Sequence, residues 1–344
     1  MYEDLSYREK EVLKHIVENF IRNALPVGSR FVSKQSDLNL SSATIRNVMS
    51  DLEDLDFIST PHTSAGRVPT DKGYRFYVDS LMNKENLSEN EMKVIKGTLN
   101  EKKVVKDYEF IYSETSKILS KISHQLAIVS QPFLTSGLFK KLEIVQVSSN
   151  KILVIIDVLS GLVKTVIMEV DSEIPRNRLE KLTSFLNEKL QGLTLKQIRD
   201  SFAERVKDYT TSEPELIQLF INSLDKIYEE EELGSGIHIS GTSEIILQPE
   251  LENPDIMKKV INLAEDKNFV LHIFQANTED IGVSIKIGNE NADEKLKDLS
   301  ILSKSYHYGE IKGNIGIIGT KRMNYSKMIT LLEYTSKLIT EFNS

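Results

Sequence analysis

Two short stretches of the sequence carry side chains suited to contacts with nucleic acid. The first, SSATIRNVMSDLE, runs from Ser41 to Glu53, and the second, PHTSAGRVP, runs from Pro61 to Pro69. In the major groove, arginine can pair with the edge of guanine and asparagine with the edge of adenine, while hydroxyl groups at the start of a helix suit phosphates. We therefore predict that both stretches belong to one surface that binds double-stranded DNA.

The first stretch is predicted to form a helix over residues 41–55 with two different faces. Apolar residues recur at intervals of three and four and should pack inward, namely Ile45, Val48, Met49, Leu52 and Leu55. The opposite face carries Ala43, Arg46, Asn47 and Ser50. We expect Arg46 to pair with guanine, Asn47 with adenine, and Ala43 to touch a thymine methyl group.

Phosphate contacts are expected where this helix begins. Three hydroxyl residues stand there, Ser41, Ser42 and Thr44. Free N–H groups and the positive end of the helix dipole favour anions at the same place. The acidic residues of the helix lie toward its other end, where a helix in the major groove would leave the DNA.

The second stretch is predicted to form the tip of a hairpin, or wing, between two short strands. Gly66 would allow a tight turn with a positive φ angle, and Pro61 and Pro69 would limit the freedom of the tip. Arg67 would then lie along the minor groove or the backbone. His62 would either contact a phosphate or stabilise the turn.

The charge distribution agrees with this surface. The whole chain has a net charge of -8, and residues 1–82 hold 10 basic against 12 acidic residues. Within them, residues 22–50 sum to +3 and residues 57–78 sum to +2, and the latter include Lys72 and Arg75, which we expect to reach phosphates. One copy of such a surface would bind weakly, so we expect a dimer.

The composition narrows the class of protein further. The chain of 344 residues is long enough for two or three domains, and it has no cysteine, which excludes disulfides and thiolate chemistry and suits the cytoplasm. We expect no membrane span, because the most apolar run, Ile152–Leu159, is far too short. We expect no metal, because the six histidines are scattered without the spacing of metal ligands, and no cofactor. His62 stands beside the wing, and His238 and His272 alternate with apolar residues in expected strands. No arrangement of nucleophile, base and orienting group indicates an enzyme.

The patterns predict an α+β chain in several parts. The first part is expected to hold helices over 6–25, 33–38, 41–55 and 70–82, with the hairpin between the last two. A long helix is expected over 106–129, and a three-stranded meander over 142–170. Helices should follow over 175–190, 194–206 and 213–232. From Gly234 onward strands recur, including 244–248 and 269–275, with helices beginning near Pro254 and spanning 324–342.

Residues Val27–Asp79 strongly resemble the N-terminal signature of the HrcA family of heat-inducible transcription repressors. The segments IKIGNEN (Ile285–Asn291) and IKGNIGIIGTKRMNYSKMITLLEYT (Ile311–Thr335) are similar to the C-terminal region of that family. At Asp56 the resemblance leads us to expect glycine, as the stop of the preceding helix.

The resemblance implies a fold and a function. The fold would be a winged helix-turn-helix domain over 1–82, a GAF-like domain over 83–140 and 234–344, and a dimerisation domain over 141–233 inserted into it. The function would be negative regulation of chaperone genes, with a dimer binding an inverted-repeat operator. The chaperonin GroEL would keep the repressor active. The meander and its helices, with the 106–129 helix, are our prediction for the dimer surface.

Another class of protein stays open on the sequence alone. The 41–55 helix would look the same in a small-molecule sensor or a protein-interaction scaffold with no DNA target. The run GNIGIIGTKR (Gly313–Arg322) has glycine at every third position but lacks the Gly-Lys-Ser/Thr ending of a phosphate loop. We attribute these glycines to strand geometry, although Lys321 and Arg322 could line a pocket.

Overall fold

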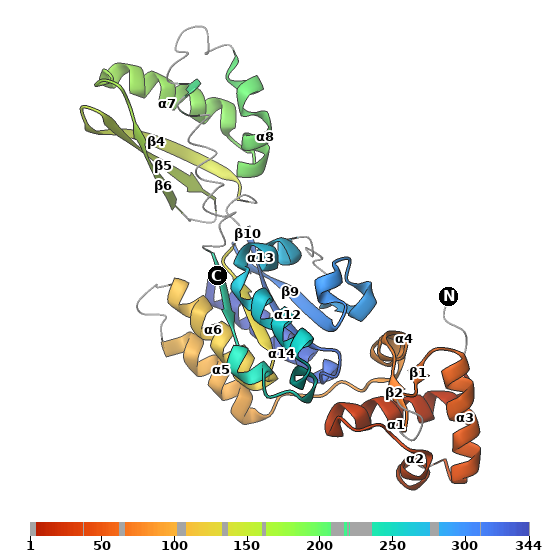
Figure 1. Ribbon diagram of the computed structural model, residues 1–344. Coiled ribbons are helices and arrows are strands. Elements are labelled where there is room, and N and C mark those ends of the chain that lie inside the picture. Colours follow the sequence, from red (N-terminus) through yellow and green to blue (C-terminus); the bar gives the residue numbers. More distant parts are fainter. Residues whose placement is uncertain are drawn as a thin grey trace.

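The structure is a computed structural model that describes residues 5–36, 38–61, 66–101, 108–132, 137–159, 163–207, 217–218, 220, 236–275, 282–309 and 311–343. It is an α+β chain whose strands form three sheets, of two, five and three strands (Figure 1). We call the parts built on these sheets the N-terminal unit (residues 5–82), the five-stranded unit (described residues of 83–132 and 236–343) and the three-stranded unit (described residues of 137–220). None of the described helices combines the length and apolar character needed to cross a membrane.

The N-terminal unit contains helices α1 (Tyr7–Asn23), α2 (Ser29–Gln35), α3 (Ser42–Asp54) and α4 (Asp71–Phe76), the π-helix η1 (Tyr77–Leu81), and strands β1 (Ile58–Ser59) and β2 (Val68–Pro69). Helix α1 begins at a capping box, in which Ser6 and Glu9 each accept from the other's backbone N–H. Helix α2 begins four residues before its predicted start, because Gly28 is its N-cap and Val32 is fully buried as its anchor.

Two turns of the N-terminal unit differ from the sequence prediction. Asp56 has φ 62°, so it adopts the left-handed conformation for which glycine was expected, and its carbonyl accepts a hydrogen bond from the Thr70 hydroxyl at 2.6 Å. Gly66, in contrast, has no positive φ. Glycine is needed there because a Cβ atom would collide with the backbone of Val27. The hairpin pairs Ile58 with Pro69.

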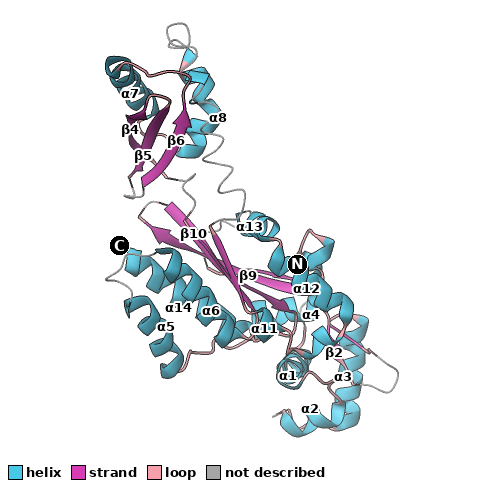
Figure 2. Cartoon of the chain, turned by 60° about the vertical axis from the view of Figure 1, so that its left-hand side comes forward, coloured by secondary structure: helices cyan, strands magenta, loops and turns pink. Residues whose placement is uncertain are grey.

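The five-stranded unit is an antiparallel sheet in the order β7-β3-β10-β9-β8. Its strands are β3 (Leu126–Ser130), β7 (Ile237–Ser240), β8 (Ser284–Ile287), β9 (Leu299–Tyr308) and β10 (Ile311–Thr320). Its helices are α5 (Glu89–Glu101), α6 (Tyr108–Ser123), α11 (Thr242–Ile245), α12 (Pro254–Glu265), α13 (Lys267–Gln275) and α14 (Tyr325–Asn343), with the 3-10 turns η3 (Pro249–Glu252), η4 (Gly288–Glu290) and η5 (Glu294–Leu296). Helices cover both faces (Figure 2).

Three predicted elements of this unit were wrong. The helix predicted to reach Val129 ends at Ser123, and His124 turns the chain with φ 54° into β3. Residues 126–129 are all apolar and are buried on both faces of the sheet, a pattern that does not distinguish helix from strand. The strand predicted over 269–275 is helix α13, in which Val270, Leu271 and Phe274 are buried and His272 is exposed. The strand predicted over 244–248 contains the end of α11 and a turn. His238 lies in β7 as predicted.

The three-stranded unit confirms the predicted meander. Its strands β4 (Phe139–Ser148), β5 (Lys151–Val158) and β6 (Val163–Glu169) pair in sequence order, and helices α7 (Arg176–Leu190) and α8 (Leu195–Arg205) cover one face. Strand β4 begins at Phe139, two residues before the predicted domain boundary. The helix predicted over 213–232 lies almost wholly outside the described residues.

The order of strands shows where the three-stranded unit joins the sheet. Strands β3 and β7 are antiparallel neighbours, with Ser130 opposite Ile237. The chain therefore leaves the five-stranded sheet at the end of β3 and returns beside it at β7, the edge strand. The three-stranded unit and the five-stranded unit have separate hydrophobic cores. In contrast, one core cluster runs from the N-terminal unit into the five-stranded unit.

Candidate nucleic-acid interface

Helix α3 presents the predicted polar face to solvent. Ala43, Arg46, Asn47 and Ser50 are exposed. On the other side, Ile45, Met49 and Leu52 are almost fully buried in the core that α3 shares with α1. The predicted division of this helix into two faces is confirmed. Its exposed face combines a cation, an amide and small side chains, a set that can approach base edges without steric hindrance.

The hydroxyl residues at the start of α3 hold the helix in place. Ser41 is the N-cap, and its side chain accepts from the Thr44 N–H at 3.1 Å. The Ser42 hydroxyl is hydrogen bonded to that of Ser29 at 3.0 Å, which joins the starts of α2 and α3. Ser33 adds a hydrogen bond to the carbonyl of Leu40 at 2.8 Å. The angle between the two helices is thus fixed by side chains as well as by the core.

Arg67 lies at the base of the hairpin and not at its tip. Its backbone pairs with Val27 through hydrogen bonds of 2.8 and 2.9 Å. Its Nη2 lies 2.8 Å from Oε2 of Glu53, and the other oxygen of Glu53 accepts from the Thr60 hydroxyl at 2.5 Å. Glu53 thus ties the end of α3 to both strands of the hairpin. His62, predicted beside the tip, lies outside the described residues.

The two basic residues of α4 face the protein. Lys72 donates to the carbonyl of Leu55 at 2.8 Å and lies 4.4 Å from the centre of the Phe57 ring, so it neutralises the C-terminal end of α3. Arg75 donates to Glu290 at 2.7 and 2.5 Å and to the carbonyl of Ile285 at 2.7 Å. The hydrogen bonds that Arg75 donates to the Glu290 carboxylate hold the pKa of Arg75 well above its usual range.

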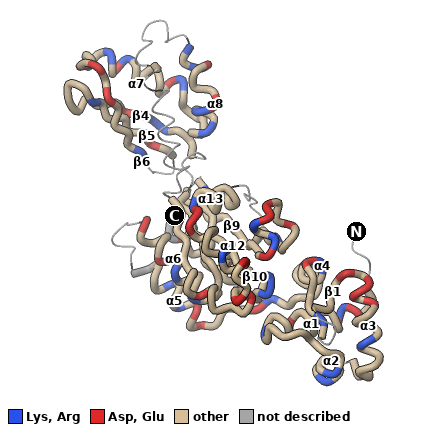
Figure 3. The backbone as a smooth tube through the Cα atoms, viewed as in Figure 1, with Lys and Arg blue, Asp and Glu red and all other residues tan. Residues whose placement is uncertain are grey.

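The prediction that Arg75 reaches a phosphate is therefore wrong for this structure, because the five-stranded unit takes its donors. Sequence reasoning also gave no separate role to Arg30 and Lys34, which are exposed. Both belong to α2, on which Figure 3 marks basic residues in blue. The Ser29–Ser42 hydrogen bond brings the start of α2 against the start of α3. The local excess of positive charge over residues 22–50 was the signal that could have identified them.

The glycines of Gly313–Arg322 serve packing, in agreement with the sequence analysis. They lie in β10, where Gly313 adjoins the Tyr306 ring and Gly316 the Phe274 ring. A Cβ atom at either position would overlap the ring. Lys321 and Arg322, which follow the strand, contact the N-terminal unit.

A short helix pair, a hairpin beside the second helix and a solvent-facing polar stripe are the features of a helix-turn-helix regulator. Comparison with known proteins gives the family. A family model described as HrcA protein C terminal domain matches residues 109–329. The chain belongs to the HrcA family of heat-inducible transcription repressors, as the resemblance predicted, and this is not a family of enzymes.

The relatives cover nearly the whole chain. "Heat-inducible transcription repressor HrcA" of Chlorobium phaeobacteroides (strain BS1) is 37% identical over 342 residues, which are 97% of this chain and 97% of the relative. The protein of the same name from Chlorobaculum tepidum is 39% identical over 349 residues, 99% of this chain and 98% of the relative. A crystal structure of a hypothetical protein at 2.2 Å resolution has a similar fold, with a TM-score of 0.59, 23% identity and 99% coverage of both chains.

Proposed function

We propose that this protein represses chaperone genes by binding an inverted-repeat DNA operator as a dimer. The observation that carries the proposal is the exposed stripe of α3, with Arg46 and Asn47 one turn after a capped helix start. Relatives that share more than a third of the sequence are named as heat-inducible transcription repressors. These names support heat-inducible genes as the genes that the protein regulates.

The contacts follow from the geometry of the interface. We assign base contacts to Ala43, Arg46 and Asn47, and a supporting contact to Ser50. Phosphate contacts fall to the start of α3, where Ser41, Ser42 and Thr44 stand, and to the exposed cations of α2, Arg30 and Lys34. Arg67 and Lys72 act from within the protein, by fixing the hairpin and the end of α3, and His62 is kept as a candidate at the tip.

A salt titration on duplex DNA from the region upstream of the gene separates this proposal from a sensor or scaffold with no DNA target. Each phosphate neutralised by a cation releases counterions, so the affinity of a repressor falls steeply as salt rises, with a slope of about 0.9 per phosphate contact. Footprinting on the same duplex should reveal two protected half-sites. Weak binding without a footprint at any site would contradict the proposal.

The dimer surface is proposed to be the face of the three-stranded sheet that no described helix covers. Val145, Leu153 and Ile167 lie side by side across its strands, and Val145 and Ile167 are 46% and 60% exposed. Val163 extends the same face and is 56% exposed. An apolar face of this kind suits a second copy in a two-fold dimer. The apolar stripe of α6 is buried within the five-stranded unit. We therefore leave this helix, which was part of the predicted dimer surface, out of the proposed one.

Sedimentation of the full chain tests this surface. Ile167→Lys places a charge in the centre of the proposed contact, so it should yield monomers and lower the affinity for a two-half-site duplex. Leu247→Lys is the matched control, since Leu247 is 80% exposed on the five-stranded unit, far from the meander in sequence. A dimer that survives Ile167→Lys would place the contact elsewhere.

The three units are proposed to be the domains that the family resemblance implies. The N-terminal unit would be the winged-helix domain of 1–82, the five-stranded unit the GAF-like domain of 83–140 and 234–344, and the three-stranded unit the inserted dimerisation domain of 141–233. The return of the chain from β3 to β7 supports an insertion.

The role of GroEL is also proposed, on the family resemblance alone. If GroEL maintains the active repressor, protein diluted from urea should recover more operator binding with GroEL and ATP than without them. Bovine serum albumin at the same concentration is the control. Equal recovery under both conditions would remove the chaperonin from the proposed function.

A further inference from the structure

A set of charged contacts fastens the N-terminal unit to the five-stranded unit. We call it the clamp, and it consists of Asp71, Arg75, Asn289, Glu290, Lys321 and Arg322. Its centre is the carboxylate of Asp71, the first residue of α4. One oxygen accepts from Lys321 Nζ at 2.6 Å, and the other accepts from the backbone N–H and the side-chain amide of Asn289, each at 2.9 Å.

Two arginines extend the clamp from opposite sides. Arg75 of α4 reaches across to Glu290, with Nη2 2.5 Å from its carboxylate. Arg322 reaches the other way and donates to the carbonyl of Ile21, the last turn of α1, at 2.7 Å. It also binds Glu250 at 2.5 Å, and its side chain is only 9% exposed. Two helices of the N-terminal unit are thus held at separate points.

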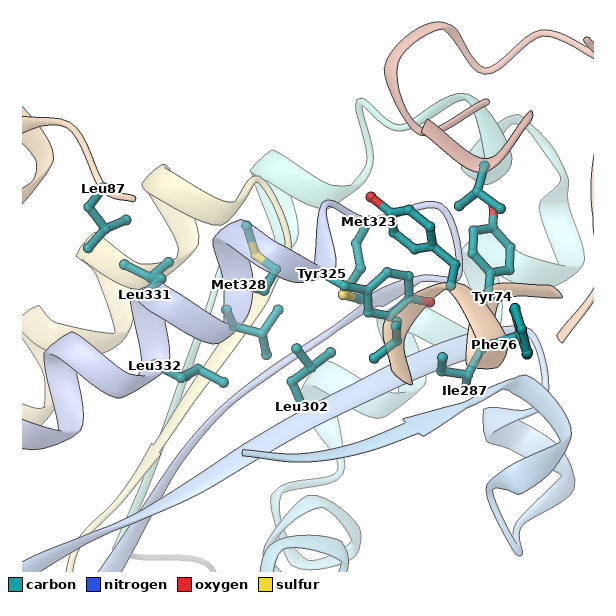
Figure 4. Packing of buried hydrophobic residues seen from close by; sticks show 14 of the residues in the cluster. Tyr74, Phe76, Leu87, Ile287, Leu302, Met323, Tyr325, Met328, Leu331 and Leu332 are labelled. Atoms are coloured by element: carbon teal, nitrogen blue, oxygen red, sulfur yellow. The ribbon is translucent and has the colours of Figure 1, made fainter. Parts of the chain in front are cut away.

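Apolar packing makes the junction rigid. Tyr74 of α4 lies against Tyr325 of α14, with ring centres 5.9 Å apart, and Phe76 lies near Ile287 at the end of β8 (Figure 4). All four side chains belong to one buried cluster. Gly288, with φ 52°, approaches the Asp71 carboxylate so closely that a Cβ atom would have no space. A junction with a shared core and a half-buried charge network has little freedom to rotate.

The clamp fixes the direction of α3 without covering it. Helix α4 follows the hairpin directly, and the hairpin is tied to α3 through Glu53. Arg46 and Asn47 stay exposed in this arrangement. The contacts therefore do not block DNA. They determine the orientation of α3 relative to the five-stranded sheet.

We infer that the clamp sets the half-site spacing that the dimer accepts, an inference that rests on the proposed function. Two rigidly aimed helices fit two half-sites at one separation and one helical phase. One added base pair rotates a half-site by about 34–36° and moves it by about 3.4 Å. If the junction is loosened, the N-terminal unit can reorient to reach the displaced half-site, at an entropic cost. If the junction is rigid, one of the two N-terminal units loses contact with its half-site. Asp71, Arg75, Glu290 and Lys321 are thus positioning residues for operator selection.

The test uses the full-length chain and a series of duplexes. The parent protein first selects its best inverted repeat from random duplexes, and that sequence is then remade with one base pair added or removed between half-sites. The variant is Lys321→Met with Glu290→Gln, both on the five-stranded unit and away from the DNA face. We expect the parent to lose about tenfold or more in affinity per added base pair, and the variant to lose about threefold or less.

Two further variants isolate the cause. Lys259→Met removes an ion pair of the same type, to Asp298 at 2.5 Å, within the five-stranded unit, and should keep the parent's spacing profile. Lys321→Arg retains the charge beside Asp71 and should restore discrimination relative to Lys321→Met. If the folded double variant discriminates spacing as the parent does, the inference is overturned. Should the double variant not fold, Lys321→Met alone decides in the same way.

A measurement without DNA keeps this inference separate from the proposed function. The chain has no cysteine, so spin labels can be placed at Gln35→Cys on α2 and Glu252→Cys in η3, both exposed. Double electron–electron resonance, with labelled protein diluted into unlabelled protein, should show a narrow distance distribution in the parent and a broad one in the clamp variant. Equal widths would refute the clamp even if DNA binds, while a protein that selects no duplex would refute the proposed function alone.

Discussion

Arg46 and Arg75 carry the same guanidinium group and belong to the same unit, yet their surroundings are opposite. Arg46 projects from α3 into solvent, with apolar neighbours only on the far side of its helix. Arg75 is surrounded by acceptors from a second unit more than 200 residues away in sequence. The comparison shows that residue type alone does not identify a DNA contact. Exposure on a helix face was predictable, whereas the partner of α4 was not.

The largest expected effect concerns the inward-facing arginine. Arg75→Ala removes the guanidinium from the Glu290 carboxylate, which keeps the Ile287 N–H at 2.8 Å, and from the Ile285 carbonyl in a half-buried junction. We expect it to lower the free energy of unfolding by about 3 kcal/mol, since removing one partner of such a network strands the other. Urea denaturation measures the change. A loss below about 0.5 kcal/mol would mean that solvent replaces the guanidinium there.

The outward-facing arginine should behave in the opposite way. Arg46→Ala should leave stability within about 0.5 kcal/mol of the parent, as exposed substitutions usually do. It should weaken operator binding by about 1–3 kcal/mol and relax the preference at one base pair. Competition binding against operators changed at each position measures both. Arg176→Ala, at a 92% exposed arginine on α7, is the control that should alter neither.

The same contrast between engaged and solvent-facing groups holds for two carboxylates of α5. A hydrogen bond from Lys327, with help from Ser88, lowers the pKa of Glu91 from 4.5 to about 2. Since the pKa of Glu91 is lowered by folding, its contribution is present above pH 4.5 and is lost as pH falls toward 2. Glu91→Gln should therefore flatten stability against pH in that window, and Glu89→Gln, at an 87% exposed side chain, should not. Thermal melts at a series of pH values measure the dependence of stability on pH. The same dependence in Glu91→Gln and the parent would show that ionisation of Glu91 is not linked to folding.

The smallest expected effect concerns the turn after α3. Asp56 holds a left-handed conformation that costs a residue with a Cβ atom more than glycine. Asp56→Gly should raise the free energy of unfolding by about 0.5 kcal/mol, because the greater entropy of glycine in the unfolded chain offsets part of the relief. Operator binding should not change. A destabilised variant would indicate that the aspartate side chain supports the turn.

The predictions that succeeded relied on local patterns. Spacings of three and four separated the faces of α3, the Ser6–Glu9 pair located the start of α1, and alternation revealed the meander. The two failures at the site depended on partners outside the segment. Arg67 is held by Glu53 and Arg75 by Glu290. Neither ion pair can be predicted from the residue pattern around the arginine. Residues 126–129 were misassigned because a strand buried on both faces loses the periodicity that distinguishes helix from strand. Residues 269–275 were misassigned because the apolar run of α13 is too short to separate a helical spacing from a strand, although His272 is exposed.

The adjacency of β3 and β7 has a consequence for how this architecture can be altered. Ser130 and Ile237 stand directly opposite each other, so a two-residue turn would join the two strands as an ordinary hairpin. A chain shortened in this way would keep every backbone hydrogen bond of the five-stranded sheet. The three-stranded unit is then a detachable module, and a different oligomerisation module could be grafted at the same junction without redesigning the sheet beneath it.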